Sequence, residues 1–202
     1  MKLFYSPGAC SLAPHIVLHE SGLAFEGVLA STKTHQLADG SDYYAVNPLG
    51  YVPFLVLADG RTLREGQVIS QYIADQVPAS GLAPAAGTWE RYKLQEWLSF
   101  ISSELHKGFS PLFNPATPED YKPLVKERLL QRLTWLDGEL AGKDYLMGST
   151  FTVADAYLFT VTNWAGFVKL DIAALANLAA VRARIAARPA VQAAMKAEGL
   201  VK

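Results

Sequence analysis

The sequence predicts a chain of two parts, a small α/β unit followed by an all-α unit. In residues 1–77, short apolar runs alternate with helical patterns, and turn residues separate them. Residues 78–86 are rich in proline, glycine, serine and alanine, which predicts a linker. In residues 87–202 the strand signals disappear and apolar residues recur at helical spacing. We therefore expect two domains, 1–77 and 87–202.

The first part predicts the order strand, helix, strand, hairpin, helix. Asp59 and Gly60 stand between two apolar runs, which is a strong hairpin signal because tight hairpin turns need positive φ angles. Gly22 is typical of a residue that ends a helix. We expect strands at residues 3–5, 25–29, 54–57 and 61–63, and helices at residues 12–19 and 66–77.

The second part predicts only helices. Thr152 and Asp155 have the spacing of a capping box, so we expect Thr152 to cap a helix and Asp155 to reach back to its first turn. Their role is in folding rather than in chemistry. Helices are expected at residues 89–106, 118–140, 154–168 and 173–187, with a short helix after Pro189.

Composition and charge exclude several classes of protein. The 202 residues are 50% hydrophobic, and 18 basic residues nearly balance 19 acidic ones without a basic stripe. Nucleic acid and anionic membranes are therefore not expected as partners. No apolar stretch approaches the ~18 residues of a membrane span. One cysteine cannot form an internal disulfide, which favours the cytoplasm as the location.

That single cysteine, Cys10, follows a Pro–Gly turn and precedes a helix expected to begin near Ser11. Pro14 supports this boundary because proline is tolerated in a first turn. A helix N-terminus favours an anion, so this position should stabilise a thiolate. Position 13 is alanine, which excludes an autonomous dithiol oxidoreductase. The alternative is a small buried apolar side chain.

Two further loops have features that suit a peptide-like ligand. Val52 precedes Pro53 at the entrance of a strand, where its backbone can pair with an extended peptide. Glu65 and Gly66 precede a helix whose N–H groups can hold a carboxylate, while Glu65 can accept from an ammonium group. An α-amino acid end carries both groups. The alternatives are an ordinary turn proline and a glutamate that serves the helix dipole.

Several linked motifs together resemble beta-class bacterial glutathione transferases, nearly from end to end of the chain. The motifs are Met1–Tyr5 with Pro7–Ser11, Asn47–Pro48 with Val52–Pro53, Glu65–Gly66, Glu104–Phe109 and Phe151–Leu158.

The resemblance implies an α/β thioredoxin-like N-terminal domain and an all-α C-terminal domain, the cytosolic glutathione transferase fold. It implies a homodimer with glutathione as co-substrate and no metal. Cys10 and His106 are the expected catalytic residues. Cys10 would approach the glutathione sulfur by a hydrogen bond or as a mixed disulfide, and His106 and Lys107 would lie near that sulfur.

The resemblance also implies a set of glutathione contacts. The helix that carries Ser99 would contribute partly across the dimer interface. Position 99 is often asparagine in the family, position 51 glutamine and position 35 lysine, so Lys33 or His35 would bind the glycyl carboxylate. The other reading of Glu104, His106 and Lys107 is a solvated helix face. The expected contacts are Ala9, Cys10, His35, Tyr51, Val52, Pro53, Glu65, Gly66, Ser99, Ser103, Glu104, His106 and Lys107.

The expected reaction is conjugation of the glutathione thiolate with small hydrophobic electrophiles, as in detoxification. Tyr5, Phe109, Phe113 and Trp164 are candidates for the electrophile pocket. Two alternatives remain open from the sequence. One is glutathione-dependent thiol–disulfide exchange through Cys10, and the other is a non-catalytic carrier of apolar ligands.

Overall fold

The computed structural model describes residues 1–202, which divide into two compact units. Met1–Ala83 and Ala187–Lys202 form one unit, here called the α/β unit, and Pro84–Ala186 form the helical unit. The expected fold class, α/β followed by all-α, is confirmed. The expected domain limits, 1–77 and 87–202, stay a prediction. In the structure, the last helix groups with the α/β unit and not with the helices that precede it.

The α/β unit contains one mixed four-stranded sheet in the order β2-β1-β3-β4. β1 pairs in parallel with β2, as expected when a helix connects two strands, and antiparallel with β3. Side chains alternate between the two faces, so Phe4 and Phe54 share one face, where they pack with Tyr43. The strands are β1 (Lys2–Tyr5), β2 (Glu26–Leu29), β3 (Phe54–Val56) and β4 (Thr62–Leu63).

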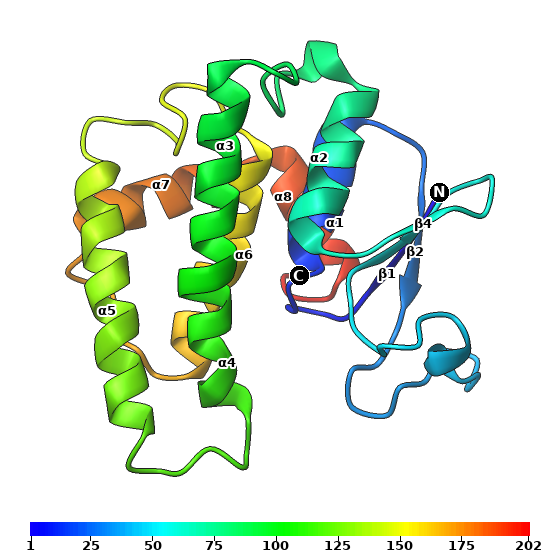
Figure 1. Ribbon diagram of the computed structural model, residues 1–202, viewed down its shortest axis with the longest axis horizontal. Coiled ribbons are helices and arrows are strands. Elements are labelled where there is room, and N and C mark those ends of the chain that lie inside the picture. Colours follow the sequence, from blue (N-terminus) through cyan, green and yellow to red (C-terminus); the bar gives the residue numbers. More distant parts are fainter. The chain divides into compact units, whose positions relative to one another are not determined.

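Helix α1 (Leu12–Ser21) is the centre of the helices in this unit, because it packs against both α2 (Gly66–Gln76) and α8 (Pro189–Ala197) (Figure 1). Every residue from Leu12 to Leu18 is buried, which explains why α1 lacks a polar face. Gly22 ends α1 in the left-handed conformation, as predicted. Two short turns complete the unit, η1 (Tyr43–Ala45) and η2 (Pro78–Ser80).

The helical unit is built around α6 (Val153–Phe167), which is buried along most of its length. The helix expected at 89–106 continues to Phe113, because α3, η3 and α4 follow one another without a break. The helix expected from Pro118 begins at Lys122. The other elements are α3 (Trp89–Phe100), the π-helical segment η3 (Ile101–His106), α4 (Lys107–Phe113), α5 (Lys122–Glu139) and α7 (Ala176–Ala186).

The capping box at the start of α6 is confirmed. The backbone N–H of Thr152 donates to Asp155 Oδ2 at 2.8 Å, and the Thr152 hydroxyl donates to the same oxygen at 2.9 Å. The N–H of Leu146 donates to Asp155 Oδ1 at 2.8 Å. Asp155 is fully buried, and this burial raises its pKa to about 6, although the hydrogen bonds oppose the shift. Asp155 therefore ties the preceding loop to α6.

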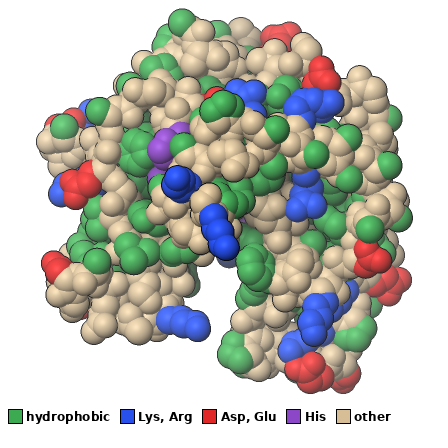
Figure 2. All heavy atoms as spheres, turned by 180° about the vertical axis from the view of Figure 1, so that it is seen from behind, with side chains coloured by type: hydrophobic (Ala, Val, Ile, Leu, Met, Phe, Trp, Pro, Cys, Tyr) green, Lys and Arg blue, Asp and Glu red, His purple; other side chains and the backbone are tan.

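The surface carries both signs of charge. On the face drawn in Figure 2, Lys and Arg side chains are interspersed with Asp and Glu, and neither sign forms a continuous area. No helix has the length and apolar character needed to cross a membrane.

Candidate active site

Three sequence motifs that lie far apart along the chain meet in the α/β unit. The Cys10 thiol donates to the backbone oxygen of Val52, with 3.2 Å between Sγ and O. The peptide bond between Val52 and Pro53 is cis. A Cβ atom on Gly66 would lie 3.4 Å from Pro53 Cγ and 3.9 Å from the Cys10 oxygen. The N-terminus of α2 therefore approaches the same loop that faces Cys10.

Cys10 is half-buried, so its thiol is not enclosed in apolar packing. The backbone before α1 turns tightly, because Leu12 N–H donates to the Ala9 oxygen at 3.0 Å and Ala13 N–H donates to the Cys10 oxygen at 3.3 Å. These two amides are therefore engaged in the turn that leads into α1. In the ligand-free protein the thiol is a donor to the loop that carries Pro53.

The loop before Cys10 is held by Glu198, a residue that sequence reasoning missed. Glu198 Oε2 accepts from Gly8 N–H at 2.9 Å, and Oε1 lies 2.8 Å from His15 Nδ1. The side chains of His15 and Glu198 are 3% and 0% exposed. Burial, and secondly the Glu198 carboxylate, raise the pKa of Tyr5. No local pattern marks Glu198, because its partners lie more than 180 residues earlier in the chain.

Tyr43 and Asn47 hold the loop on the other side of Cys10. The Tyr43 hydroxyl and the Asn47 side-chain amide each donate to the Tyr51 backbone oxygen at 2.8 Å. Arg64 Nε donates to Asn47 Oδ1 at 3.2 Å. Burial raises the pKa of Tyr43 to about 12, against the opposing effects of Asn47 and Arg64. These contacts fix the carbonyl directly before Val52.

Glu65 occupies an unusual backbone conformation at the start of α2. Its φ and ψ angles are 64° and 110°, a backbone conformation that residues other than glycine rarely adopt. Its backbone oxygen accepts from the N–H groups of Val68 and Ile69, both at 2.9 Å. Its side chain is exposed and does not cap the helix. Positive φ at a residue other than glycine is often found at ligand sites, where it costs about 1–3 kcal/mol.

His35 packs against the turn that leads to Val52. Its ring lies 4.5 Å from that of Tyr44, its φ angle is 53°, and its Nδ1 is buried without a hydrogen-bond partner. A Cβ atom on Gly50 would lie 2.7 Å from this nitrogen, so only glycine fits there. Tyr51 is 69% exposed, and Lys33 is also exposed. Of the two candidates for the glycyl carboxylate, His35 is the one built into this loop.

In the helical unit, Glu104 lies in the π-helical segment η3, between α3 and α4. The N–H of Lys107 donates to the oxygen of Ser102, five residues earlier, as in a π-helix. Glu104 Oε2 accepts from Arg132 Nε of α5 at 2.7 Å. Ser99 and Ser103 are exposed on the α3–η3 surface, where the Ser103 hydroxyl donates to the Ser99 oxygen at 2.9 Å.

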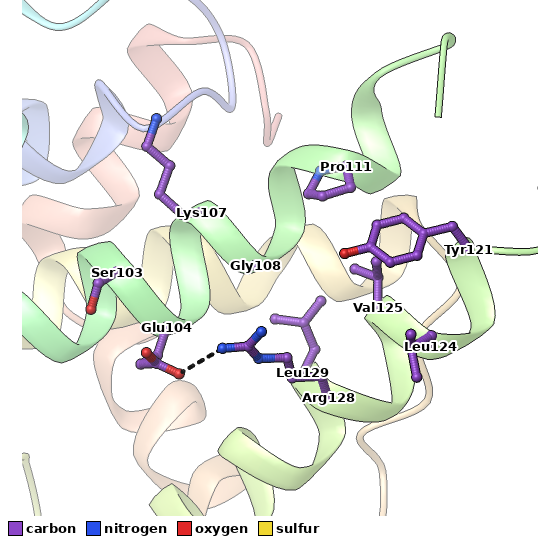
Figure 3. Close-up of a pocket in the computed structure, with 10 residues that line it drawn as sticks. All are labelled: Ser103, Glu104, Lys107, Gly108, Pro111, Tyr121, Leu124, Val125, Arg128 and Leu129. Carbon is purple, nitrogen blue, oxygen red and sulfur yellow. Dashed lines mark ion pairs between the residues drawn. The ribbon is translucent and has the colours of Figure 1, made fainter. Parts of the chain in front are cut away.

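A groove of about 220 Å³ lies between η3–α4 and α5. Figure 3 shows Glu104 and Arg128 facing each other across it, with 3.9 Å between Oε2 and the guanidinium, while the Lys107 side chain extends away from this pair. Leu129 forms part of its apolar wall and packs closely on Gly108.

His106 faces α6 rather than α5. Its Nδ1 lies 2.6 Å from the hydroxyl oxygen of Tyr157, and its ring lies 4.9 Å from that of Trp164. Burial, and secondly the charge of Lys107, lower the pKa of His106 to about 4. The expected alternative of a common solvated face for Glu104, His106 and Lys107 is therefore wrong, since Glu104 and His106 pack against different helices and only Lys107 is exposed.

Trp164 also brings the apolar candidates of this unit together. Its ring lies 5.9 Å from Phe109 and 5.8 Å from Phe113, both in edge-to-face geometry. Tyr5, the fourth candidate, belongs to the α/β unit. No group of three or more His, Cys, Asp or Glu side chains is arranged to hold a metal ion.

Comparison with known proteins places both units in one family. Residues 8–76 match the family described as glutathione S-transferase, N-terminal domain, and residues 100–189 match its C-terminal domain. Glutathione S-transferase GstA of Escherichia coli O157:H7 is 52% identical to this chain over 99% of the chain and 100% of the relative. Glutathione S-transferase GST-4.5 of Xanthomonas campestris is 38% identical over 99% and 100%. The chain belongs to the glutathione S-transferase family.

Solved structures narrow this assignment to the beta class. A bacterial beta-class glutathione S-transferase of Sphingomonas chungbukensis has a TM-score of 0.96 at 50% identity, with both chains covered completely. The structure of a sphingomonad glutathione S-transferase complexed with glutathione has a TM-score of 0.95 at 52% identity and the same coverage. The expected class, a glutathione transferase enzyme, is confirmed, and the findings support it over a non-catalytic carrier.

Proposed function

We propose that this chain conjugates the thiolate of glutathione with small hydrophobic electrophiles. The observation that carries the proposal is the meeting of Cys10, Val52 and Gly66, with Sγ of Cys10 3.2 Å from the Val52 oxygen. A thiol donor, the backbone before a cis-proline and a helix N-terminus suit the sulfur, the peptide groups and the γ-glutamyl end of glutathione. The sphingomonad relative is complexed with this tripeptide.

In the proposed complex, Val52 pairs its backbone with the cysteinyl part of glutathione. The α2 N-terminus at Gly66 holds the γ-glutamyl carboxylate, and Glu65 accepts from its ammonium group. His35 binds the glycyl carboxylate, with Lys33 as the other candidate. Ala9, Tyr51 and Pro53 complete the lining of this proposed glutathione site.

At the sulfur, the Cys10 thiol exchanges its bond to Val52 for a bond to the glutathione thiolate. The glutathione proton passes to solvent. The thiolate then attacks an electrophilic carbon, a C–S bond forms, and the leaving group departs with its electron pair. The protein contributes positioning and stabilisation of the anion.

The helical unit supplies the rest of the proposed site. His106 and Lys107 stabilise the sulfur anion, and Phe109, Phe113 and Trp164 form an apolar wall for the electrophile. We propose a cytoplasmic homodimer in which Ser99, Ser103 and Glu104 reach glutathione partly across the interface. The adjacent exposed residues on α3 and η3 support this placement.

The proposal is tested by measuring glutathione binding calorimetrically and conjugation of an activated aryl halide spectrophotometrically. Wild type, Cys10→Ala and Tyr121→Phe are compared, since Tyr121 is exposed beside α5, outside the proposed site, and serves as a control. We expect binding and turnover in wild type and in the control. Conjugation that survives in Cys10→Ala, with reduction of mixed disulfides lost, would assign Cys10 to disulfide exchange. A wild-type protein that ignores glutathione at millimolar concentration would overturn the proposal.

A further inference from the structure

The contact between His106 and Tyr157 determines which nitrogen of the imidazole carries the proton. We propose that Tyr157 is a positioning residue that holds His106 as the neutral Nε2–H tautomer, so that His106 acts as a hydrogen-bond donor and not as a base. The donor role toward the glutathione sulfur rests on the proposed function. The tautomer itself is a property of the helical unit alone.

The positions of His106 and Tyr157 are fixed by the helices that carry them and by ring packing. His106 is the last residue of the π-helical segment η3, and Tyr157 lies on α6, just beyond the capping box. Tyr157 is 5% exposed. The rings of His106 and Tyr157 are 5.9 Å apart at an interplanar angle of 85°. On another side the His106 ring contacts Trp164 at 70°, so a rotation of the imidazole would disturb two packed contacts.

The direction of the hydrogen bond follows from the chemistry of the two groups. A phenol hydroxyl is a far stronger acid than the N–H of a neutral imidazole, and an unprotonated imidazole nitrogen is a stronger acceptor than a phenol oxygen. The separation of 2.6 Å between Nδ1 and Oη is also shorter than an ordinary N–H···O bond. Tyr157 therefore donates to Nδ1, which leaves the proton on Nε2.

A neutral ring is required for this arrangement, because both nitrogens of an imidazolium are donors. The surroundings favour neutrality, since burial and then Lys107 lower the pKa of His106 to about 4. Glu104 does not offset this effect, because it is engaged with Arg132. His106 is thus neutral through the range in which a glutathione thiol ionises.

The tautomer changes what the ring offers to a sulfur. With the proton on Nε2, this nitrogen donates to a thiolate and stabilises it. With the proton on Nδ1, Nε2 presents a lone pair, which repels a thiolate and favours the thiol. Lys107 then supplies charge and His106 supplies a fixed, uncharged donor.

Nitrogen-15 NMR of the ligand-free protein tests the tautomer directly. The chain has four histidines, and a His106→Gln variant assigns the ring signals of His106. We expect an acceptor-type Nδ1 and a protonated Nε2 in wild type, and a mixture of tautomers in Tyr157→Phe. Tyr121→Phe, at an exposed tyrosine beside α5, should retain the wild-type pattern. A protonated Nδ1 in wild type, or an unchanged His106 pattern in Tyr157→Phe, would overturn the proposal. The wild-type spectrum decides the tautomer even where Tyr157→Phe fails to fold.

The donor role is tested by titrating the ultraviolet absorbance of the thiolate of bound glutathione. In Tyr157→Phe we expect the pKa of that thiol to rise by up to about one unit, whereas Tyr121→Phe should leave it unchanged. An unshifted thiol pKa in Tyr157→Phe would refute the donor role. Absence of glutathione binding in wild type would instead refute the proposed function, and the tautomer seen by NMR would still stand.

Discussion

Single residues in this chain are fixed by partners that are either a few positions away or very far along the sequence. Asp155 is the clearest local case, because its carboxylate accepts from Thr152 and Leu146 within the same turn and the preceding loop. Glu198 is the distant case, since it binds Gly8 and His15. Local partners leave a pattern in the sequence, and distant partners do not.

Replacing Asp155 by alanine should destabilise the protein by about 2–4 kcal/mol, because buried donors on Thr152 and Leu146 lose their acceptor. Denaturant unfolding followed by circular dichroism measures the loss. Asp120→Ala is the control, since Asp120 is exposed. Equal stability of the two variants would refute the structural role of the capping box.

Gly50 and Gly40 form a matched pair for the loop that carries His35. Both have positive φ, 65° and 84°, but only a Cβ on Gly50 would meet other atoms, Nδ1 of His35 and the Tyr44 ring, both at 2.7 Å. Gly40→Ala should cost about 1–2 kcal/mol from the backbone alone. Gly50→Ala should cost more and should also raise the KM for glutathione. Equal losses of unfolding free energy in the two variants would exclude the close packing.

At the scale of elements, the π-helical segment η3 places neighbouring side chains against two different helices. Glu104 turns to Arg132 on α5 and His106 turns to Tyr157 on α6. Residues two positions apart lie on nearly opposite sides of a helix, so one solvated face cannot hold both side chains. The π-turn adds a residue to this part of the helix, and the sequence shows no sign of it.

The packing of η3 on α6 predicts a pH dependence of stability. The pKa of His106 is about 4 in the folded protein, below the ordinary value of 6.5, so between these values only the unfolded chain binds the proton. Its contribution to stability is therefore present above about pH 6.5 and is lost as the pH falls toward 4. We expect the stability of wild type relative to His106→Gln to decline over this window in denaturant titrations. A constant difference from pH 7 to 4 would contradict burial of a neutral ring.

At the scale of the whole molecule, the two units do not follow the order of the chain. Residues 187–202 return to the α/β unit, where α8 packs on α1 and Glu198 holds the loop before Cys10. Val191 and Ala194 of α8 are buried. The final helix is therefore part of the α/β core and of the support for the proposed thiol site.

A chain that ends at Ala186 should lose the fold of its α/β unit. Exposure of α1 and loss of the partner of His15 remove several kcal/mol from a total stability that is commonly about 5–15 kcal/mol. We expect increased binding of an apolar dye and no binding of glutathione. Removal of Val201 and Lys202 alone should leave both properties intact. Normal glutathione binding by the shorter chain would show that α8 is dispensable.

The sequence by itself determined the order of strands and helices, the position of Cys10 between a turn and a helix, and the capping box at Thr152. These features depend on contacts within a few residues, so periodicity and turn residues are enough to reveal them. The tertiary structure alone decided the partners of His106, Glu104 and Cys10, and the place of α8. Such partners are brought together when distant segments pack against each other. The free energy of that packing depends on residues from several segments, so no single stretch of the sequence reveals it.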